Sequence, residues 1–330
     1  MSTQLFWFRN DLRIEDNTAL IQALKQGPTV AIYVATPEQW LVHDDAPIKI
    51  DFWRRNLQEL YVSLQKINVP LLFFQVPTYA ELPQLIQNIV GRWEITSLHC
   101  NAEYPLNERK RDDKVAAFCK KNEIEFHCYE DQCILPPDFV LTAEGSPFKV
   151  FTPYAKKSKF VLESAGLAKS NSPNLENSNT VSLKLLPALD NQLELDQIDW
   201  PQVASWWQQQ WPAGEKEAMQ RLNNFVDSKI NKYKIDRDYP AINGTSSLSP
   251  YLASGVISVR VCWEHAKLMQ GESSLTWCNE LLWRDFYKYV MYHYHMFVCI
   301  RPGIKIMQTY RGGKILMSLS VGVMEKRAFR

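Results

Sequence analysis

The chain has 330 residues, of which 46% are hydrophobic, and this length accommodates roughly two domains with buried cores. The formal net charge of +1 excludes a strong overall basic field, so any nucleic-acid binding must come from a local patch. The seven cysteines show no C-x-x-C spacing, which indicates free thiols in a reducing cytoplasm rather than a disulfide framework or a zinc site. We find no signal-peptide pattern and no apolar run of about 18 residues, so we expect a cytoplasmic protein without a membrane-spanning helix.

Residues 1–135 alternate short apolar runs with longer amphipathic ones. The apolar runs predict strands at 4–9, 30–35, 71–76, 97–101 and 125–129. The amphipathic runs predict helices near 19–25, 48–67, 80–90 and 108–121. This alternation of strands and helices favours an α/β domain built on a doubly wound parallel sheet.

The chain changes character after this first domain. Residues 168–199 are rich in Ser, Asn, Pro and Leu, which is typical of a surface linker. Helical patterns follow at 214–229, 256–270 and 275–294, so we expect the second domain to be all-α. We therefore divide the chain into an α/β domain at 1–135, a connection and linker at 136–198, a helical domain at 199–294 and an atypical, glycine-interrupted tail at 295–330.

Polar residues collect where the predicted strands end. An Arg-Asn-Asp run at 9–11 follows the first strand, His43 lies a short loop beyond the second, and Asn107 and Glu108 follow the fourth. Ligands of open α/β sheets bind outside these carboxyl ends. Ordinary caps and turns are the competing interpretation, since Asn107 can cap a helix that Glu108 opens. The domain holds neither G-x-G-x-x-G nor a Walker A motif, so a dinucleotide or P-loop site is not supported.

Residues 277–287 concentrate aromatic and charged side chains on one predicted helix. Trp277, Glu280 and Arg284 have a spacing that places them close to one face, and Trp283 and Tyr287 form an i, i+4 pair beside it. A stacking plane, a guanidinium and a carboxylate suit a planar, phosphate-bearing ligand or a base turned out of a duplex. The alternative is a core helix whose polar groups are satisfied internally.

Two further segments have the composition of anion-binding sites. The hydroxyl-rich run at 245–249 precedes a predicted helix and can meet a phosphate, although a Ser-rich N-cap is the common alternative. Lys229, Lys232, Lys234 and Arg237 form a compact basic patch near this run, and a solvated helix face would show the same pattern.

These segments together resemble the DNA photolyase/cryptochrome family, most closely the folate-type photolyases that repair cyclobutane pyrimidine dimers. The resemblance covers residues 1–294 in order. It rests on the Leu-Phe-Trp-Phe-Arg-Asn-Asp-Leu-Arg run at 5–13 with Asp16-Asn17, on Ala-Thr-Pro-Glu-Gln-Trp at 35–40, on Asn-Glu-Arg at 107–109, on Lys-Val-Phe-Thr-Pro-Tyr at 149–154, and on the 245–249 and 277–287 segments.

The resemblance implies an α/β doubly wound antenna domain, an all-α FAD-binding domain, and the activity of a deoxyribodipyrimidine photo-lyase. In that activity light drives electron transfer from reduced FAD to the dimer in DNA, the cyclobutane ring splits, and the electron returns. By resemblance the protein is a monomer that acts on dimer-containing DNA and has no membrane partner.

The resemblance also assigns residues. It places a 5,10-methenyltetrahydrofolate antenna at His43, Asn107 and Glu108. It places FAD at Tyr233, Thr245, Ser246, Ser247, Leu248, Ser249, Trp277, Glu280 and Arg284. Many relatives have a basic residue where Ser247 stands, which weakens one phosphate contact. It assigns DNA contacts to Arg237, Glu280, Trp283 and Tyr287, with Glu280 and Trp283 as the catalytic pair that meets the extruded dimer.

The chain departs from this family at its end. Relatives continue through a tryptophan-rich helical region that supplies the rest of the flavin cavity, and residues after Tyr294 do not resemble them. We therefore expect a C-terminally truncated FAD domain, a frameshift near residue 295 and an inactive product. Two alternatives stay open: a cryptochrome-like blue-light receptor without repair, and a non-catalytic remnant that binds a pterin. Glu280 and Trp283 favour repair, since a sensor has no need of a lesion pocket.

Overall fold

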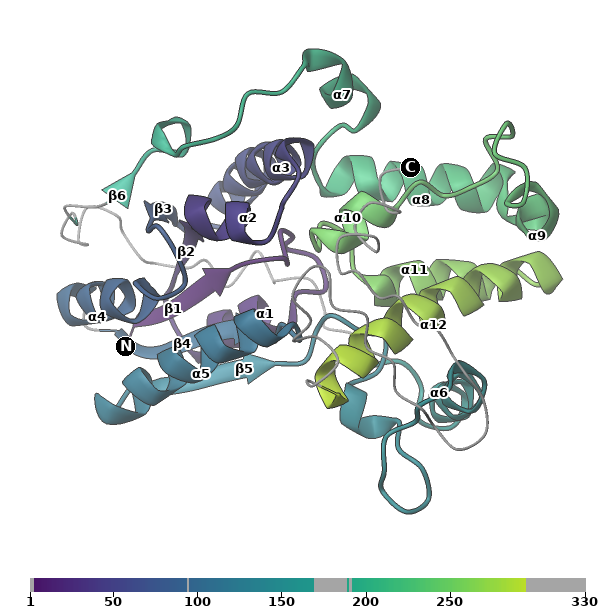
Figure 1. Cartoon of the computed structure of the whole chain (residues 1–330), viewed down its shortest axis with the longest axis horizontal. Coiled ribbons are helices and arrows are strands. Elements are labelled where there is room, and N and C mark those ends of the chain that lie inside the picture. Colours follow the sequence, from purple (N-terminus) through teal and green to yellow (C-terminus); the bar gives the residue numbers. More distant parts are fainter. Residues whose placement is uncertain (1–2, 94, 169–188, 190–191, 295–330) are drawn as a thin grey trace.

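A computed structural model describes residues 3–93, 95–168, 189 and 192–294. The tail expected at 295–330, its frameshift and most of the expected linker lie outside the described residues. Figure 1 shows a sheet flanked by helices in the first part of the chain and a helical bundle in the second. The fold class predicted from the sequence is confirmed.

The sheet has six strands in the described residues, in the order β5-β4-β1-β2-β3-β6. Neighbouring strands from β5 to β3 pair in parallel, and β6 pairs with β3 in the opposite direction. The bounds are β1 Thr3–Phe8, β2 Thr29–Ala35, β3 Leu71–Gln75, β4 Ile95–Asn101, β5 Glu125–Tyr129 and β6 Gln192–Leu193. Every residue of β2 is buried, as a central parallel strand covered on both faces requires.

Helices cover both faces of this sheet. One face packs against α1 Thr18–Gln26, α2 Pro37–Val42 and α3 Pro47–Lys66, and the other packs against α4 Leu82–Trp93 and α5 Leu106–Lys121. Asn17 caps α1 by accepting a 3.2 Å hydrogen bond from the backbone N–H of Leu20. The predicted cap of α5 is wrong, because that helix begins at Leu106 with Pro105 at the cap position.

The second part of the chain is helical, as expected. Its elements are α7 Ser205–Gln210, α8 Glu215–Ser228, α9 Tyr233–Asp236, α10 Ser249–Ala253, α11 Val259–Leu268 and α12 Glu272–His293. Short 3-10 turns lie at Pro137–Phe139, Leu195–Gln197 and Ile230–Lys232. No helix within the described ranges is long and apolar enough to cross a membrane.

The segment between the two parts is more regular than a linker. Helix α6, Phe151–Ala165, lies within it and packs beside α12, although the sequence analysis assigns no helix there. Strand β6 also lies in the expected linker and adds an antiparallel edge to a sheet that we expected to be wholly parallel. A two-residue strand carries too short a pattern to be recognised from sequence.

The helical part docks on the carboxyl ends of the strands. Gly255 has φ +64°, and a Cβ atom there would lie 2.2 Å from the carbonyl oxygen of Asn10, so glycine is required at this close approach. Arg260 of α11 donates to carboxylate oxygens of Asp16 and Asp131, at 2.8 and 2.7 Å, and Arg13 also pairs with Asp131. One apolar core continues from the face of β1 into α8, α10, α11 and α12.

Candidate functional site

His43, Asn107 and Glu108 come together at the carboxyl edge of the sheet. His43 ends α2, and the other two lie in the first turn of α5. The His43 Nε2 atom lies 3.0 Å from the side-chain nitrogens of both Asn107 and Gln39. Its Nδ1 atom lies 3.7 Å from a carboxylate oxygen of Glu108. The structure therefore brings together the three residues that the sequence analysis named, and their role as a chromophore site stays a prediction.

Other polar groups surround His43 in this cluster. The amide nitrogens of Asn107 and Gln39 both lie within hydrogen-bond distance of the same ring nitrogen of His43. Tyr79, which the sequence analysis missed, donates its hydroxyl to Glu108 at 3.2 Å and places its ring edge-on to His43. Burial raises the pKa of Glu108, and burial next to that carboxylate raises the pKa of Tyr79. These groups can hydrogen-bond the polar edge of a planar heterocycle.

A buried ionic network fills the neighbouring strand ends. Arg9 donates to Asp112 at 2.8 Å and to the carbonyl of Asn101, while Arg111 donates to Glu103 at 2.7 Å. Burial alone would raise the pKa of Glu103, but the two arginines outweigh it and hold this pKa at about 2. The rest of the Arg-Asn-Asp run at 9–11 is also engaged within the protein, since Asn10 donates to Glu103 at 2.7 Å and Asp11 accepts from the backbone N–H of Arg9 at 2.7 Å.

A second group of predicted residues lines a cavity of about 490 Å³ between α6, α9 and α12. Glu280 and Trp283 line it from α12, and Arg237 lines it from the end of α9. The guanidinium of Arg237 pairs with the carboxylate of Glu280 at 2.5 Å. The remaining lining residues are Phe151, Thr152, Ala155, Lys156, Lys159, Thr276 and Asn279.

Trp283 presents a stacking plane at this cavity. Its ring lies face to face with Phe151, with centroids 3.6 Å apart and an interplanar angle of 11°. Tyr287, one turn further along α12, is 43% exposed and its ring centroid is 5.8 Å from that of Trp283. The predicted aromatic pair is therefore adjacent, with Phe151 as an added member.

Trp277 and Arg284 do not join Glu280 at the cavity, although the helical spacing predicted a shared face. Trp277 is 3% exposed and packs against Phe225 in the core, with centroids 4.8 Å apart. Arg284 donates to the backbone carbonyls of Gln132, at 2.8 Å, and Leu252, at 3.3 Å. Among the described residues these two side chains hold α12 against its neighbours.

The hydroxyl-rich loop before α10 forms a separate feature. Thr245 and Ser249 are exposed, Ser246 and Ser247 are partly buried, and Leu248 is buried in the core. Tyr233 is 8% exposed and lies edge-on to Phe225. Within the described part of the chain, the lining of the cavity includes none of these six predicted residues.

Comparison with known proteins assigns the chain to a family. The DNA photolyase family profile matches residues 4–173. This chain belongs to the DNA photolyase family. The deoxyribodipyrimidine photo-lyase of Vibrio cholerae is 35% identical over 297 residues, covering 87% of this chain and 61% of the relative. The Escherichia coli K12 deoxyribodipyrimidine photo-lyase is 31% identical over 306 residues, covering 91% of this chain and 62% of the relative. The photolyase-family chain thus spans about three fifths of these curated relatives.

Solved structures agree with this fold. A bacterial class III photolyase from Agrobacterium tumefaciens superposes with a TM-score of 0.75 at 23% identity, over 89% of this chain and 60% of that one. A cryptochrome from Synechocystis gives a TM-score of 0.71 at 23% identity, over 89% and 62%. An archaeal photolyase from Sulfolobus tokodaii, solved with two FAD molecules, gives 0.67 at 25% identity, over 89% and 61%.

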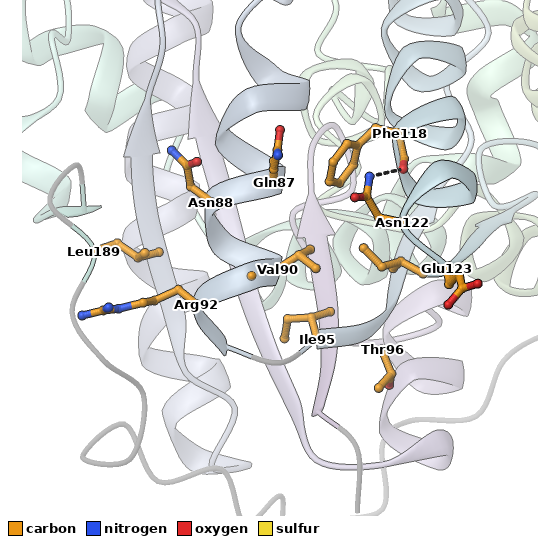
Figure 2. A pocket seen from close by; sticks show the side chains of 12 residues that line it. Gln87, Asn88, Val90, Arg92, Ile95, Thr96, Phe118, Asn122, Glu123 and Leu189 are labelled. Carbon is orange, nitrogen blue, oxygen red and sulfur yellow. Dashed lines mark hydrogen bonds between the residues drawn. The ribbon is translucent and has the colours of Figure 1, made fainter.

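A larger cavity of about 1040 Å³ lies elsewhere in this photolyase-family fold, between α4 and α5 (Figure 2). Ile95 and Thr96 open β4 beside it, so it lies at the amino edge of the sheet, opposite to the edge where ligands of α/β sheets bind. The side-chain amide of Asn122 donates a 2.8 Å hydrogen bond to the backbone carbonyl of Phe118 (Figure 2). We therefore give this cavity no part in the photolyase site.

Sequence reasoning missed the contribution of α6 to the smaller cavity. Phe151 belongs to the 149–154 motif that carries the family resemblance, but the sequence predicts only a connection between domains for this segment. The Lys-Lys-Ser-Lys run at 156–159 was a usable signal, because lysines three apart lie on one side of a helix. Lys156 and Lys159 both line the cavity.

Proposed function

We propose that this chain acts in the light-driven repair of cyclobutane pyrimidine dimers in DNA, as a deoxyribodipyrimidine photo-lyase. One observation carries the proposal: Trp283, Glu280 and Arg237 line a single cavity. The proposal includes a monomer that works on DNA in the cytoplasm. It also keeps the division at 1–135, 136–198 and 199–294 into antenna domain, connection and FAD-binding part.

The cavity suits an extruded pyrimidine dimer attached to a phosphate backbone. A ligand site of about 300–1,000 Å³ is typical for small molecules, and this cavity has about 490 Å³. Trp283 offers a plane on which a base can stack, and the carboxylate of Glu280 can accept a hydrogen bond from a base edge. Lys156, Lys159 and Arg237 supply positive charge at its rim for the phosphates.

FAD is the cofactor we propose, as in the archaeal photolyase solved with it. The hydroxyls of Thr245, Ser246 and Ser249 fit a phosphate, since they stand on an exposed or half-exposed loop. Trp277 and Arg284 fit less well as direct contacts, because their groups are already engaged within the protein. When bound, FAD supplies light-driven electron donation to the dimer. The part of this chain is to hold and orient both molecules and to exclude water.

For the antenna we propose 5,10-methenyltetrahydrofolate at the His43 cluster. Glu108 and Asn107 provide an acceptor and a donor within reach of His43, and Tyr79 provides a ring beside them. Such a set complements the N–H and carbonyl groups of a pterin edge. This assignment is independent of the cavity at α12, so each can fail without the other.

The proposed function is tested with the whole chain and two matched oligonucleotides, one holding a single cyclobutane pyrimidine dimer and one undamaged. We expect tighter binding of the dimer-containing strand in the dark. Loss of the dimer under blue light, once reduced FAD is added, would overturn the expectation of an inactive product, and persistence of the dimer would agree with that expectation. Equal affinity for the two strands would refute the lesion site and favour the light-receptor alternative.

A further inference from the structure

The ion pair of Arg237 with Glu280 joins the two chemical halves of the proposed site. We propose that this pair is a specificity latch: a DNA phosphate must displace Glu280 from Arg237, and only a lesion in the cavity gives Glu280 a new partner. This inference rests on the proposed function and adds a way in which the site distinguishes damaged from undamaged DNA.

The geometry places both partners where DNA would meet them. The Arg237 guanidinium and the Glu280 carboxylate lie 2.5 Å apart, and their side chains are 34% and 42% exposed. Arg237 follows α9 while Glu280 stands near the middle of α12, so the pair bridges two elements across the cavity lip. Asp238 lies further from the same guanidinium, at 3.7 Å, and the Tyr233 ring centroid lies 5.9 Å away.

A phosphate and Glu280 compete for the same guanidinium. Glu280 occupies the Nη1 end of this guanidinium, and arginine binds carboxylates and phosphates through the same N–H donors, so a phosphate that takes this end displaces the carboxylate. The released carboxylate of Glu280 accepts hydrogen bonds and donates none, so it then requires a donor from another group.

A lesion supplies that donor and undamaged DNA does not. A pyrimidine that has left the duplex and lies on Trp283 presents the N–H groups of its base edge, and Glu280 lines the same cavity. In undamaged DNA the base stays stacked, so Glu280 loses Arg237 and gains only water. The phosphate contact is therefore weakened for undamaged DNA and fully effective for damaged DNA.

The expected size of the latch follows from its exposure. Exposed ion pairs are weak, and the range measured for them corresponds to a change of about 1.5- to fivefold in affinity. The latch thus sharpens discrimination modestly, beside the larger contribution of base stacking.

A double-mutant cycle on the whole chain tests the latch, with binding of undamaged DNA as the readout. Glu280→Gln keeps the shape of the side chain and removes its charge, so it should strengthen undamaged binding by about 1.5- to fivefold. In the Arg237→Ala background the same change should have no effect, because there is no pair left to break. A general electrostatic effect of Glu280 would instead appear equally in both backgrounds.

Glu272→Gln is the matched control. Glu272 pairs with Lys234 between the same two elements, both side chains are exposed, and neither lines the cavity. The effect of Glu272→Gln on the affinity for undamaged DNA measures what the loss of one negative charge does by itself. The preference for damaged DNA should not change in this variant.

The outcomes separate the latch from the proposed function. If the wild-type chain prefers damaged DNA and the cycle shows coupling, the latch is supported. If that preference exists but Glu280→Gln acts alike in both backgrounds, the latch is refuted and the repair function stands. If the wild-type chain shows no lesion preference, the proposed function fails and the latch fails with it.

Discussion

Phe151 on α6 lies face to face with Trp283 on α12, with ring centroids 3.6 Å apart. The sequence analysis did not predict helix α6. Its contact with Trp283 therefore links an unpredicted helix to the residue that we propose stacks on the lesion. Phe151 covers one face of Trp283 and lines the same cavity, so it fixes the orientation of the tryptophan ring there. Phe151 is thus a positioning residue for the proposed site.

Phe151→Ala should reduce the preference for damaged DNA, because Trp283 loses the ring that fixes it. An aromatic pair contributes about 0.5–1.5 kcal/mol beyond its buried area, so a loss of about two- to tenfold is expected. Phe151→Tyr should retain most of the preference. Phe160→Ala, on the same helix at 62% exposure, is the control. A lesion preference equal to wild type in Phe151→Ala would contradict the positioning role.

The ionic contacts between the sheet and α11 make a prediction about stability. Asp131 is buried between Arg13 and Arg260, which together lower its pKa against the opposing effect of burial. Removing one partner of a buried pair costs about 3–5 kcal/mol, so Arg260→Met should lower the free energy of unfolding by that order. Urea unfolding at neutral pH measures it, and a loss below 1 kcal/mol would argue against a stabilising interface.

The same carboxylate should influence acid unfolding. Its folded-state pKa is depressed, so its contribution is present above its unfolded-state pKa of about 3.9 and is lost as the pH falls toward the folded value. Asp131→Asn should therefore flatten the dependence of stability on pH below about 4. An unchanged acid profile in this variant would show that Asp131 does not carry the effect.

Glu215 should make the stability of the fold depend on pH in the opposite direction. It accepts backbone hydrogen bonds from Ile14 at 2.6 Å and Glu15 at 3.1 Å, yet burial outweighs them and raises its pKa to about 7. A carboxyl with a raised folded pKa stabilises the fold most below its unfolded value of about 4.3, and that contribution is lost as the pH rises to about 7.

Glu215→Gln should remove this dependence. Between pH 5 and 8 the wild-type chain should lose about 1–3 kcal/mol more stability than the variant. Chemical denaturation at the two pH values gives the comparison. Parallel curves for the two proteins would mean that Glu215 has an ordinary pKa.

The sequence predicted the sheet well because each parallel strand carries its own signal. The buried run of β2 is apolar apart from Thr29, and helix α4 beside the sheet shows a clear helical period. Helix α6 was not predicted because Pro153, in its first turn, is typical of a break between elements. Strand β6 depends on its partner β3, and such a pairing leaves almost no trace in two residues.

The candidate site was predicted in part for a similar reason. His43, Asn107 and Glu108 were found because the carboxyl ends of parallel strands meet at one edge. Tyr79 follows β3 at the same edge, but it carries no charge and was therefore not recognised in the sequence as a site residue. Trp277 has suitable spacing for the cavity, but spacing cannot reveal that Phe225 packs against it in the core.

The antenna proposal predicts a loss of pterin affinity in Asn107→Ala combined with Glu108→Ala. Glu108 is buried while Asn107 is exposed, so most of the loss comes from the pterin group left without Glu108, at about 1–3 kcal/mol, and affinity should fall about fivefold or more while the fold persists. Fluorescence titration with the reduced folate measures it. Asn88→Ala serves as the control, because Asn88 lies on α4 and lines the larger cavity at the amino edge of the sheet. Unchanged affinity would show that these residues do not hold the pterin.

The account depends most on Trp283 as the plane that receives the lesion, and a competition assay with damaged and undamaged DNA tests this directly. Trp283→Ala should lose lesion preference by about 1–3 kcal/mol, since stacking acts only on a base that has left the duplex. Arg237→Ala should weaken binding of both DNAs and flatten the salt dependence of binding by about one unit of slope, and it should lower the lesion preference only by the factor of about 1.5 to 5 that the latch contributes, less than Trp283→Ala does. These two variants should therefore separate across salt concentrations. Equal loss of lesion preference in both, or none in Trp283→Ala, would contradict it.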